Sequence, residues 1–164
     1  MKALKELLES KGYQPVRLMK IYVDEAAMYH FLVEAELNGV EGYFIVDSGA
    51  TSTVVDAQKA KKFGLEAPEI QPEIQAMGAS PDELDIRFAG FYPVRIKKWK
   101  GKSFPVMMMD IDHITGAMEE AGWEVDGILG ADVLHAGKAV LDYGKQRMFL
   151  KKKRKKNKKK KKNK

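Results

Sequence analysis

The residues of this chain best suited to chemistry are Asp47, Ser48 and Gly49, which directly follow the apolar residues 43–46. The apolar run is β-prone and short enough to be a strand buried on both faces, and Asp-Ser-Gly is a turn signal that ends it. A carboxylate at the end of a buried strand is costly in free energy unless it has a role. Ser48 can hydrogen-bond locally or to a partner, Gly49 permits close backbone approach, and Ala50 leaves room beside the carboxylate. Asp47 could therefore hold a water molecule and activate it as a general base.

The same turn permits two other interpretations. In an Asx turn the aspartate side chain accepts a hydrogen bond from the backbone two residues ahead, so Asp47 would only cap the next segment. The hydroxyl groups of Ser48, Thr51 and Ser52 invite a serine nucleophile, but no G-x-S-x-G elbow supports one. The Asp-Ser-Gly-Ala match alone leaves the structural alternative open.

A second motif favours the catalytic interpretation. Residues 125–134 read Val-Asp-Gly-Ile-Leu-Gly-Ala-Asp-Val-Leu, and Asp132 is an eligible N-cap for a short helix that runs to Gly137. The Asp-Ser-Gly-Ala-Thr turn and this later segment, in this order, resemble the retropepsin-like aspartic proteases, and the single-domain bacterial type most closely. The resemblance covers roughly residues 30–150.

The resemblance implies a mainly β fold, namely a closed retropepsin-like barrel with short helices and one lobe per chain. It also implies roles for the residues of both motifs: Asp47 is catalytic, Ser48 ties two active-site turns together, and the rest of the turn lines the substrate backbone. The implied site residues are Asp47; Ser48, Gly49, Ala50 and Thr51 in the turn; Ile128, Leu129 and Gly130 in the supporting strand; and Met77, Gly78 and Ala79 as a candidate flap. No cofactor and no metal ion is implied.

The number of catalytic aspartates sets the expected assembly. Aspartic protease chemistry uses two carboxylates a few ångströms apart that share one proton. This chain has a single Asp-[Ser/Thr]-Gly, because Asp126-Gly127 lacks the hydroxyl residue and Asp142-Tyr143-Gly144 has a tyrosine there. A twofold homodimer would supply a second Asp47. The sequence thus predicts an aspartic endopeptidase that acts as a homodimer on peptide or protein substrates.

A second hypothesis belongs to a different class. The chain could be a retropepsin-fold dimerisation or binding module that cleaves little or nothing and holds anionic partners through its basic tail. Only Ala-Met-Gly-Ala-Ser-Pro, at 76–81, stands where a flap tip is expected. The spacing of 81 residues from Asp47 to Ile128 also exceeds that expected for a minimal viral-type protease, and we place the extra residues in 110–122.

Charge is distributed unevenly along the chain. The formal net charge is +6, but residues 151–164 hold 12 of the 29 basic residues and no acid, which leaves 17 basic and 23 acidic residues in the remainder. The Lys151–Lys164 segment is expected to be disordered, because it has no apolar residue and repels itself. It could bind nucleic acid or another anionic surface weakly, or simply solubilise an acidic body; it offers no aromatic stacking platform.

Composition and the amino-terminal residues indicate the expected cellular compartment. The chain has 164 residues, 45% of them hydrophobic, and no cysteine, which fits one soluble domain in a reducing compartment. Residues 1–10 are charged and amphipathic and lack the apolar core of a signal peptide, and no run approaches transmembrane length. We expect a cytoplasmic protein without a transmembrane segment.

These signals predict the elements that must position the turn. Three regions are expected: an amino-terminal amphipathic helix over 1–14, a retropepsin-like domain over 15–150 and a lysine-rich tail over 151–164. Helices are also predicted after Asp56 as far as Gly64, and over 112–120 with Asp112 as a cap. Alternation over 31–37 followed by Asn38-Gly39 predicts a hairpin into residues 40–46. The remaining predicted strands cover 16–23, 74–77, 84–88, 92–96, 104–109, 139–143 and 147–150, with Lys100-Gly101 as a turn.

Overall fold

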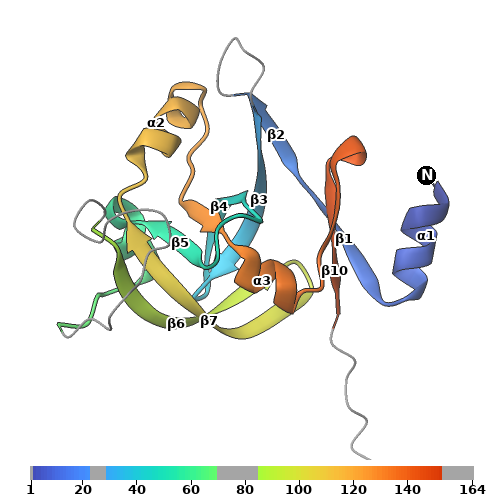
Figure 1. Ribbon diagram of the computed structural model, residues 1–164, viewed down its shortest axis with the longest axis horizontal. Coiled ribbons are helices and arrows are strands. Elements are labelled where there is room, and N and C mark those ends of the chain that lie inside the picture. The colour runs from blue at the N-terminus through green and yellow to red at the C-terminus, as the bar shows by residue number, and fades with distance from the viewer. Residues whose placement is uncertain (1, 23–28, 70–84, 153–164) are drawn as a thin grey trace, which may run out of the picture.

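The structure is a computed structural model in which residues 2–22, 29–69 and 85–152 are described (Figure 1). It is mainly β, as predicted. The strands are β1 (Tyr13–Arg17), β2 (Met19–Tyr22), β3 (Tyr29–Leu37), β4 (Val40–Val46), β5 (Thr53–Asp56), β6 (Arg87–Ile96), β7 (Trp99–Met109), β8 (Gly127–Leu129), β9 (Val140–Asp142) and β10 (Arg147–Lys151). The helices are α1 (Lys2–Ser10), α2 (Asp112–Glu120) and α3 (Ala131–Ala136), with 3₁₀ helices η1 (Ala57–Phe63) and η2 (Tyr143–Lys145).

Six strands close into a barrel. The strand order β2-β3-β4-β8-β5-β7-β6 is completed by a pairing of β3 with β6, so β2 alone lies outside the ring. Strand β4 is buried on both faces, because Phe44 packs into one hydrophobic cluster and Ile45 into another. The second cluster includes Met118 of α2, which covers that side of the sheet. The apolar run before Asp47 is therefore a strand with two buried faces, as its composition predicted.

The hairpin that delivers Asp47 forms as its sequence predicts. Leu37 pairs with Val40 across a two-residue turn, and both turn residues have positive φ, +50° at Asn38 and +84° at Gly39. These are the angles that a type I′ turn requires. The side-chain amide of Asn38 also donates to the carbonyl of Phe63 at 2.8 Å, which fastens the turn to the end of η1.

Two predictions about strands are wrong. The strand expected over 16–23 is divided between β1 and β2, which belong to different sheets; Val23 lies outside the described residues. The turn expected at Lys100-Gly101 lies at Lys97-Lys98 instead, where Ile96 pairs with Trp99. Burial decides this register, because Trp99 is only 1% exposed and must point into the core, whereas Lys97 can adopt a positive φ in solvent.

The strands predicted over 84–88 and 92–96 form one long strand, β6, that begins at Arg87. The strand predicted over 74–77 lies outside the described residues. The 3₁₀ helix η1 is capped by Asp56, which accepts from the amide of Gln58, and is followed by Gly64, as predicted. The carboxylate of Asp112 does not cap α2; instead, Asp110 accepts from the amide of Asp112 at 3.0 Å.

The chain ends form a separate sheet in the order β1-β10-β9. The closing hairpin was predicted, whereas its pairing with β1 joins residues too distant for local patterns to connect. In the parts of the chain that are described, no helix has the length and apolar character needed to cross a membrane. Figure 1 shows α1 on the outer side of β1, away from the barrel.

A buried carboxylate links the strands around β8. Asp126 is fully buried; its amide donates to the carbonyl of Tyr43 at 2.8 Å, and its Oδ2 accepts from the amide of Tyr43 at 2.9 Å. Its own carbonyl accepts from the amide of Asp56 at 2.9 Å. Lys62 Nζ of η1 reaches Asp126 Oδ1 at 2.7 Å and neutralises the buried charge. Asp126 therefore fastens β8 to both β4 and β5.

Replacement of Lys62 tests this ion pair through pH. Burial lowers the pKa of Lys62, but the hydrogen bond and charge of Asp126, with help from Glu124, outweigh it, so the pKa is raised overall. The pair therefore stabilises the fold fully below the pKa of an unfolded lysine, about 10.4, and this contribution is lost as pH rises through the folded pKa. We expect Lys62→Met to lower the unfolding free energy by about 1–3 kcal/mol at neutral pH.

Urea denaturation from neutral pH to about pH 11.5 provides the measurement, since the deficit of Lys62→Met should shrink only above about pH 10. Lys61→Met is the matched control, because Lys61 is exposed in the same helix. A deficit that stays constant across the alkaline range would contradict the assignment.

Candidate active site

The site is built where β8 enters between two strands that are consecutive in the chain. Strand β8 pairs in parallel with β4, with Val46 opposite Leu129, and antiparallel with β5, with Val54 opposite Ile128. The loop over residues 47–52 must therefore pass from β4 to β5 across the end of β8. This topology places the Asp-Ser-Gly turn directly beside the Ile-Leu-Gly segment.

Backbone hydrogen bonds fasten both ends of this loop to the second motif. The amide of Asp47 donates to the carbonyl of Leu129 at 3.2 Å, and the amide of Ala131 donates to the carbonyl of Ala50 at 2.7 Å. The predicted partnership between the turn and the segment 128–130 is therefore present as direct contact in this chain. Because both contacts use main-chain atoms, they hold the backbone at Asp47 without occupying its carboxylate.

Glycine is required where the segments touch. A Cβ at Gly130 would lie 2.5 Å from the backbone carbon and oxygen of Ser52, and one at Gly127 would lie 2.1 Å from the carbonyl oxygen of Val54. Real Cβ atoms do not approach backbone this closely, so any side chain at either position would displace the strand. Gly130 thus permits the loop to lie flat across the end of β8.

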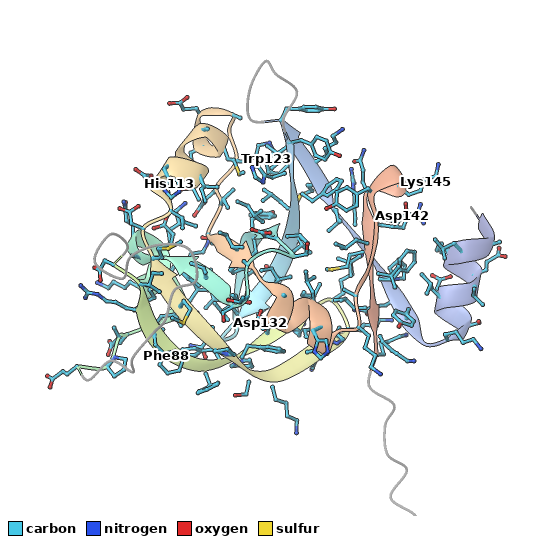
Figure 2. The ribbon with its side chains drawn as sticks, viewed as in Figure 1. Phe88, His113, Trp123, Asp132, Asp142 and Lys145 are labelled. Atoms are coloured by element: carbon cyan, nitrogen blue, oxygen red, sulfur yellow. The ribbon has the colours of Figure 1, made fainter. Side chains whose placement is uncertain are left out.

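A second carboxylate supports the loop from α3. Asp132 Oδ2 accepts from the amide of Thr53 at 3.1 Å, and Oδ1 accepts from the Thr53 hydroxyl at 3.0 Å and from the amide of Val133 at 2.8 Å. Thr53 is 1% exposed, and its Oγ1 also accepts from the amide of Gly130 at 3.4 Å. Figure 2 shows Asp132 on α3, in the middle of the molecule. The prediction that Asp132 is the N-cap of α3 is wrong, since the N-cap is Gly130.

The carboxylate of Asp47 remains available at the surface of the site. Its Oδ1 accepts from the amide of Gly49 at 2.8 Å, which is the Asx turn that the sequence also allowed. Asp47 is partly exposed, and Ser48 and Gly49 are exposed. The bond to Gly49 orients the carboxylate and leaves Oδ2 free of any hydrogen bond from the described residues. An oriented, accessible carboxylate can accept a proton from water.

A hollow of about 420 Å³ lies next to the turn. It is lined by Ser48, Ala131, Leu134, His135, Lys138, Ala139 and Leu141. Four of these residues are apolar, and they come from α3, from the residue before β9 and from β9 itself. The exposed side chain of Ser48 therefore stands at the rim of a mostly apolar depression rather than beside bulk solvent alone.

The predicted site residues fall into two groups: those that the structure describes and those that lie outside the described residues. Asp47, Ser48, Gly49, Ala50 and Thr51 form the loop, and Ile128, Leu129 and Gly130 lie against it. The candidate flap, Met77, Gly78 and Ala79, lies outside the described residues. Sequence reasoning missed the link between Thr53 and Asp132, because an aspartate one residue into a helix also fits a cap. The only signal was the hydroxyl residue at the start of the strand that follows the turn.

Truncation of Asp132 tests its support of the loop. Asp132→Ala would leave the buried amide and hydroxyl of Thr53 without their acceptor, at a cost of about 1–3 kcal/mol in unfolding free energy. In a cycle with Thr53→Val, the double variant should lose less than the sum of the single variants, because the groups interact directly. Urea denaturation of all four proteins measures the coupling. Additive losses would show that Asp132 does not act through Thr53.

Comparisons with known proteins agree with this geometry. An aspartyl protease family model matches residues 33–133, a range that includes the Asp-Ser-Gly turn and all of the second motif except its last residue, Leu134. No curated protein matches the chain. Among solved structures, the chain is similar to a retropepsin-like aspartic protease from Rickettsia conorii, with 18% identity, a TM-score of 0.50, and coverage of 85% of this chain and 90% of that one.

Two further similar structures have lower scores. The retroviral protease-like domain of Ddi1 from Leishmania major has 17% identity and a TM-score of 0.49, with coverage of 74% of this chain and 87% of that one. The EIAV protease in complex with the inhibitor HBY-793 has 16% identity and a TM-score of 0.49, with coverage of 69% and 92%. On the family match and the fold, this chain belongs to the aspartyl protease family and has the retropepsin-like fold.

Proposed function

We propose that the protein is an aspartic endopeptidase that acts as a homodimer, with one Asp47 carboxylate from each chain. The observation that carries the proposal is the loop itself: Asp47 stands at the end of a doubly buried strand, its backbone is held by Leu129, and its carboxylate is oriented but accessible. Family membership supports peptide-bond hydrolysis as the reaction.

The chemistry requires a pair of carboxylates. Two like charges held a few ångströms apart do not both ionise, so the pair shares one proton. The ionised member takes a proton from water as the water oxygen attacks the scissile carbonyl carbon, and the protonated member donates a hydrogen bond to the carbonyl oxygen. Transfer of a proton to the amide nitrogen then releases the amine as the carbon–nitrogen bond breaks. The products are a carboxylic acid and an amine, so the atoms of one water are accounted for.

A single chain supplies one such carboxylate in this loop. The supporting motif holds two more carboxylates, but Asp126 is paired with Lys62, and Asp132 accepts hydrogen bonds from Thr53 and from the start of α3. A twofold axis beside the loop would bring a second Asp47 to the first, since an isologous interface places the same residue from each copy at the axis. The exposed hydroxyl of Ser48 would then face the partner loop.

The surface beside the loop suits such an interface. The depression at whose rim Ser48 lies is lined by Ala131, Leu134, Ala139 and Leu141. Burial of such apolar surface against a partner is favourable, because it removes the surface from water. Strand β9 is also an edge of its sheet within the described residues, and an edge strand offers backbone groups with which a second chain can pair. Leu141 of β9 lines the same depression as Ser48, so one interface would cover this depression and complete the catalytic pair.

Replacement of Asp47 by asparagine tests the catalytic role. The change is nearly isosteric and removes the ionisable group, so cleavage of an unbiased peptide library across acidic to neutral pH should fall by about 10³-fold or more. Asp112→Asn is the matched control, because Asp112 is exposed on α2 and does not belong to the loop. If Asp47→Asn cleaves as fast as the control, the activity lies elsewhere. No cleavage by the unaltered protein would favour a binding module.

Mixing of subunits tests the assembly separately. If each active dimer needs two Asp47 residues, Asp47→Asn chains should inhibit the unaltered chains, because mixed dimers would contain a single Asp47 and be inactive. Equal amounts should halve the activity per unaltered chain, and about a tenfold excess should lower it to roughly a tenth, since pairing is random between equivalent surfaces. Activity should be measured after the chains have exchanged, with Asp112→Asn chains added as the control. Undiminished activity would mean that one chain suffices.

A further inference from the structure

A basic hollow lies beside the start of β1, in the sheet formed by β1, β10 and β9. It has a volume of about 380 Å³ and is lined by Glu9, Tyr13, Gln14, Pro15, Lys97, Lys98 and Lys152. The lysines come from two places that are distant in the sequence, the turn between β6 and β7 and the residue after β10. Strands β1 and β10 are paired at this end, where Tyr13 lies opposite Lys151. Three lysines thus line one concave surface.

The positions of these lysines are set by the backbone. Gln14 is 7% exposed; its side-chain amide donates to the carbonyl of Ile96 at 2.9 Å, and its Oε1 accepts from the amide of Lys98 at 3.2 Å. This residue therefore joins β1 to the β6–β7 turn. On the other side, the amide of Lys152 donates to the carbonyl of Gly12 at 3.0 Å. The hollow is consequently a built feature in which both lysine-bearing segments are tied to the start of β1.

The positive charge extends beyond the hollow. Lys100 and Lys102 continue outward along β7 from the turn and are exposed, as are Lys97 and Lys98. None of these four lysines forms an ion pair within the described residues. Glu9 is the acidic residue of the lining, and its Oε1 lies 3.9 Å from Nζ of Lys5 in the same helix. The chain continues from Lys152 into residues 153–164, which contain ten more basic residues and no acid.

We propose that this basic surface binds the phosphate backbone of single-stranded RNA. Lysine ammonium groups bind phosphates as point charges, and release of condensed counterions drives such binding. A single strand is flexible enough for its phosphates to follow a concave surface. The lining has a single aromatic ring, Tyr13, and Lys151 Nζ lies 5.4 Å from its centroid. Without a row of stacking rings, recognition is independent of base sequence.

The same features fit an anionic membrane less well. A bilayer is flat, whereas Lys97, Lys98 and Lys152 surround a depression. The nearby helix α1 does expose Leu4 and Leu7, but it has only nine residues and its polar face carries Glu6 and Glu9 as well as lysines. Helices that lie in anionic membrane surfaces are rich in lysine and arginine on their polar face. The surface therefore fits a phosphate strand, and it lies apart from the loop that holds Asp47.

The experiment measures binding of a fluorescent oligouridine, about 20 nucleotides long, to the full chain over a range of salt concentrations. The test variant is Lys97→Gln/Lys98→Gln. The control is Lys61→Gln/Lys145→Gln, which removes the same charge elsewhere; Lys145 lies at the opposite end of β10 from Lys151 (Figure 2). We expect the test variant to bind about threefold to tenfold more weakly than the control at about 100 mM salt. Its salt slope should be shallower by roughly 1.4, or about 0.7 for each lost contact.

Three results would overturn the proposal. Equal affinity and slope for the two variants would mean that the folded surface contributes nothing beyond the basic segment. Absence of oligouridine binding by the unaltered chain would mean that its positive charge has another role, such as solubility. Binding to vesicles that contain phosphatidylserine, with no binding to oligouridine, would assign the surface to a membrane. Circular dichroism of each variant shows whether it folds.

Discussion

The structure depends on the close contact between β8 and the two strands on either side of it. Strands β4 and β5 follow each other in the chain, yet β8, which arrives more than seventy residues later, lies between them and bonds to both. The contact is so close that no side chain fits at Gly127 or Gly130. Because β8 occupies the central place, the connecting loop must cross its end, and this crossing presents Asp47.

Several interactions around this contact stabilise the same arrangement. The ion pair of Asp126 with Lys62 fastens the start of β8, and the bonds of Asp132 to Thr53 fasten the loop beyond its end. Both are buried or partly buried carboxylates whose partners lie far away in the sequence. Each acts as a structural acceptor, which leaves Asp47 as the accessible carboxylate of the loop. The surroundings of each aspartate thus separate the two that support the fold from Asp47, for which we propose the catalytic role.

The two proposed activities are separated in space as well as in charge. The loop that holds Asp47 lies at the contact of β4, β8 and α3, whereas the basic hollow lies beside Gln14 and the β6–β7 turn. The chain without residues 151–164 is acidic, so the positive surface is local rather than general. Binding of RNA at the hollow would therefore leave the contacts around Asp47 unchanged.

The sequence by itself determined the local features. The composition of residues 43–46 indicated a doubly buried strand, Asn38-Gly39 indicated the turn before it, and two short motifs together indicated the family. These succeeded because strand burial and turn conformation depend on neighbouring residues. The tertiary structure decided what depends on distant partners. It placed the turn after β6 at Lys97-Lys98 because Trp99 had to be buried, and it made Asp132 a support for Thr53 rather than a cap. Such choices follow from the packing of segments that no local pattern connects.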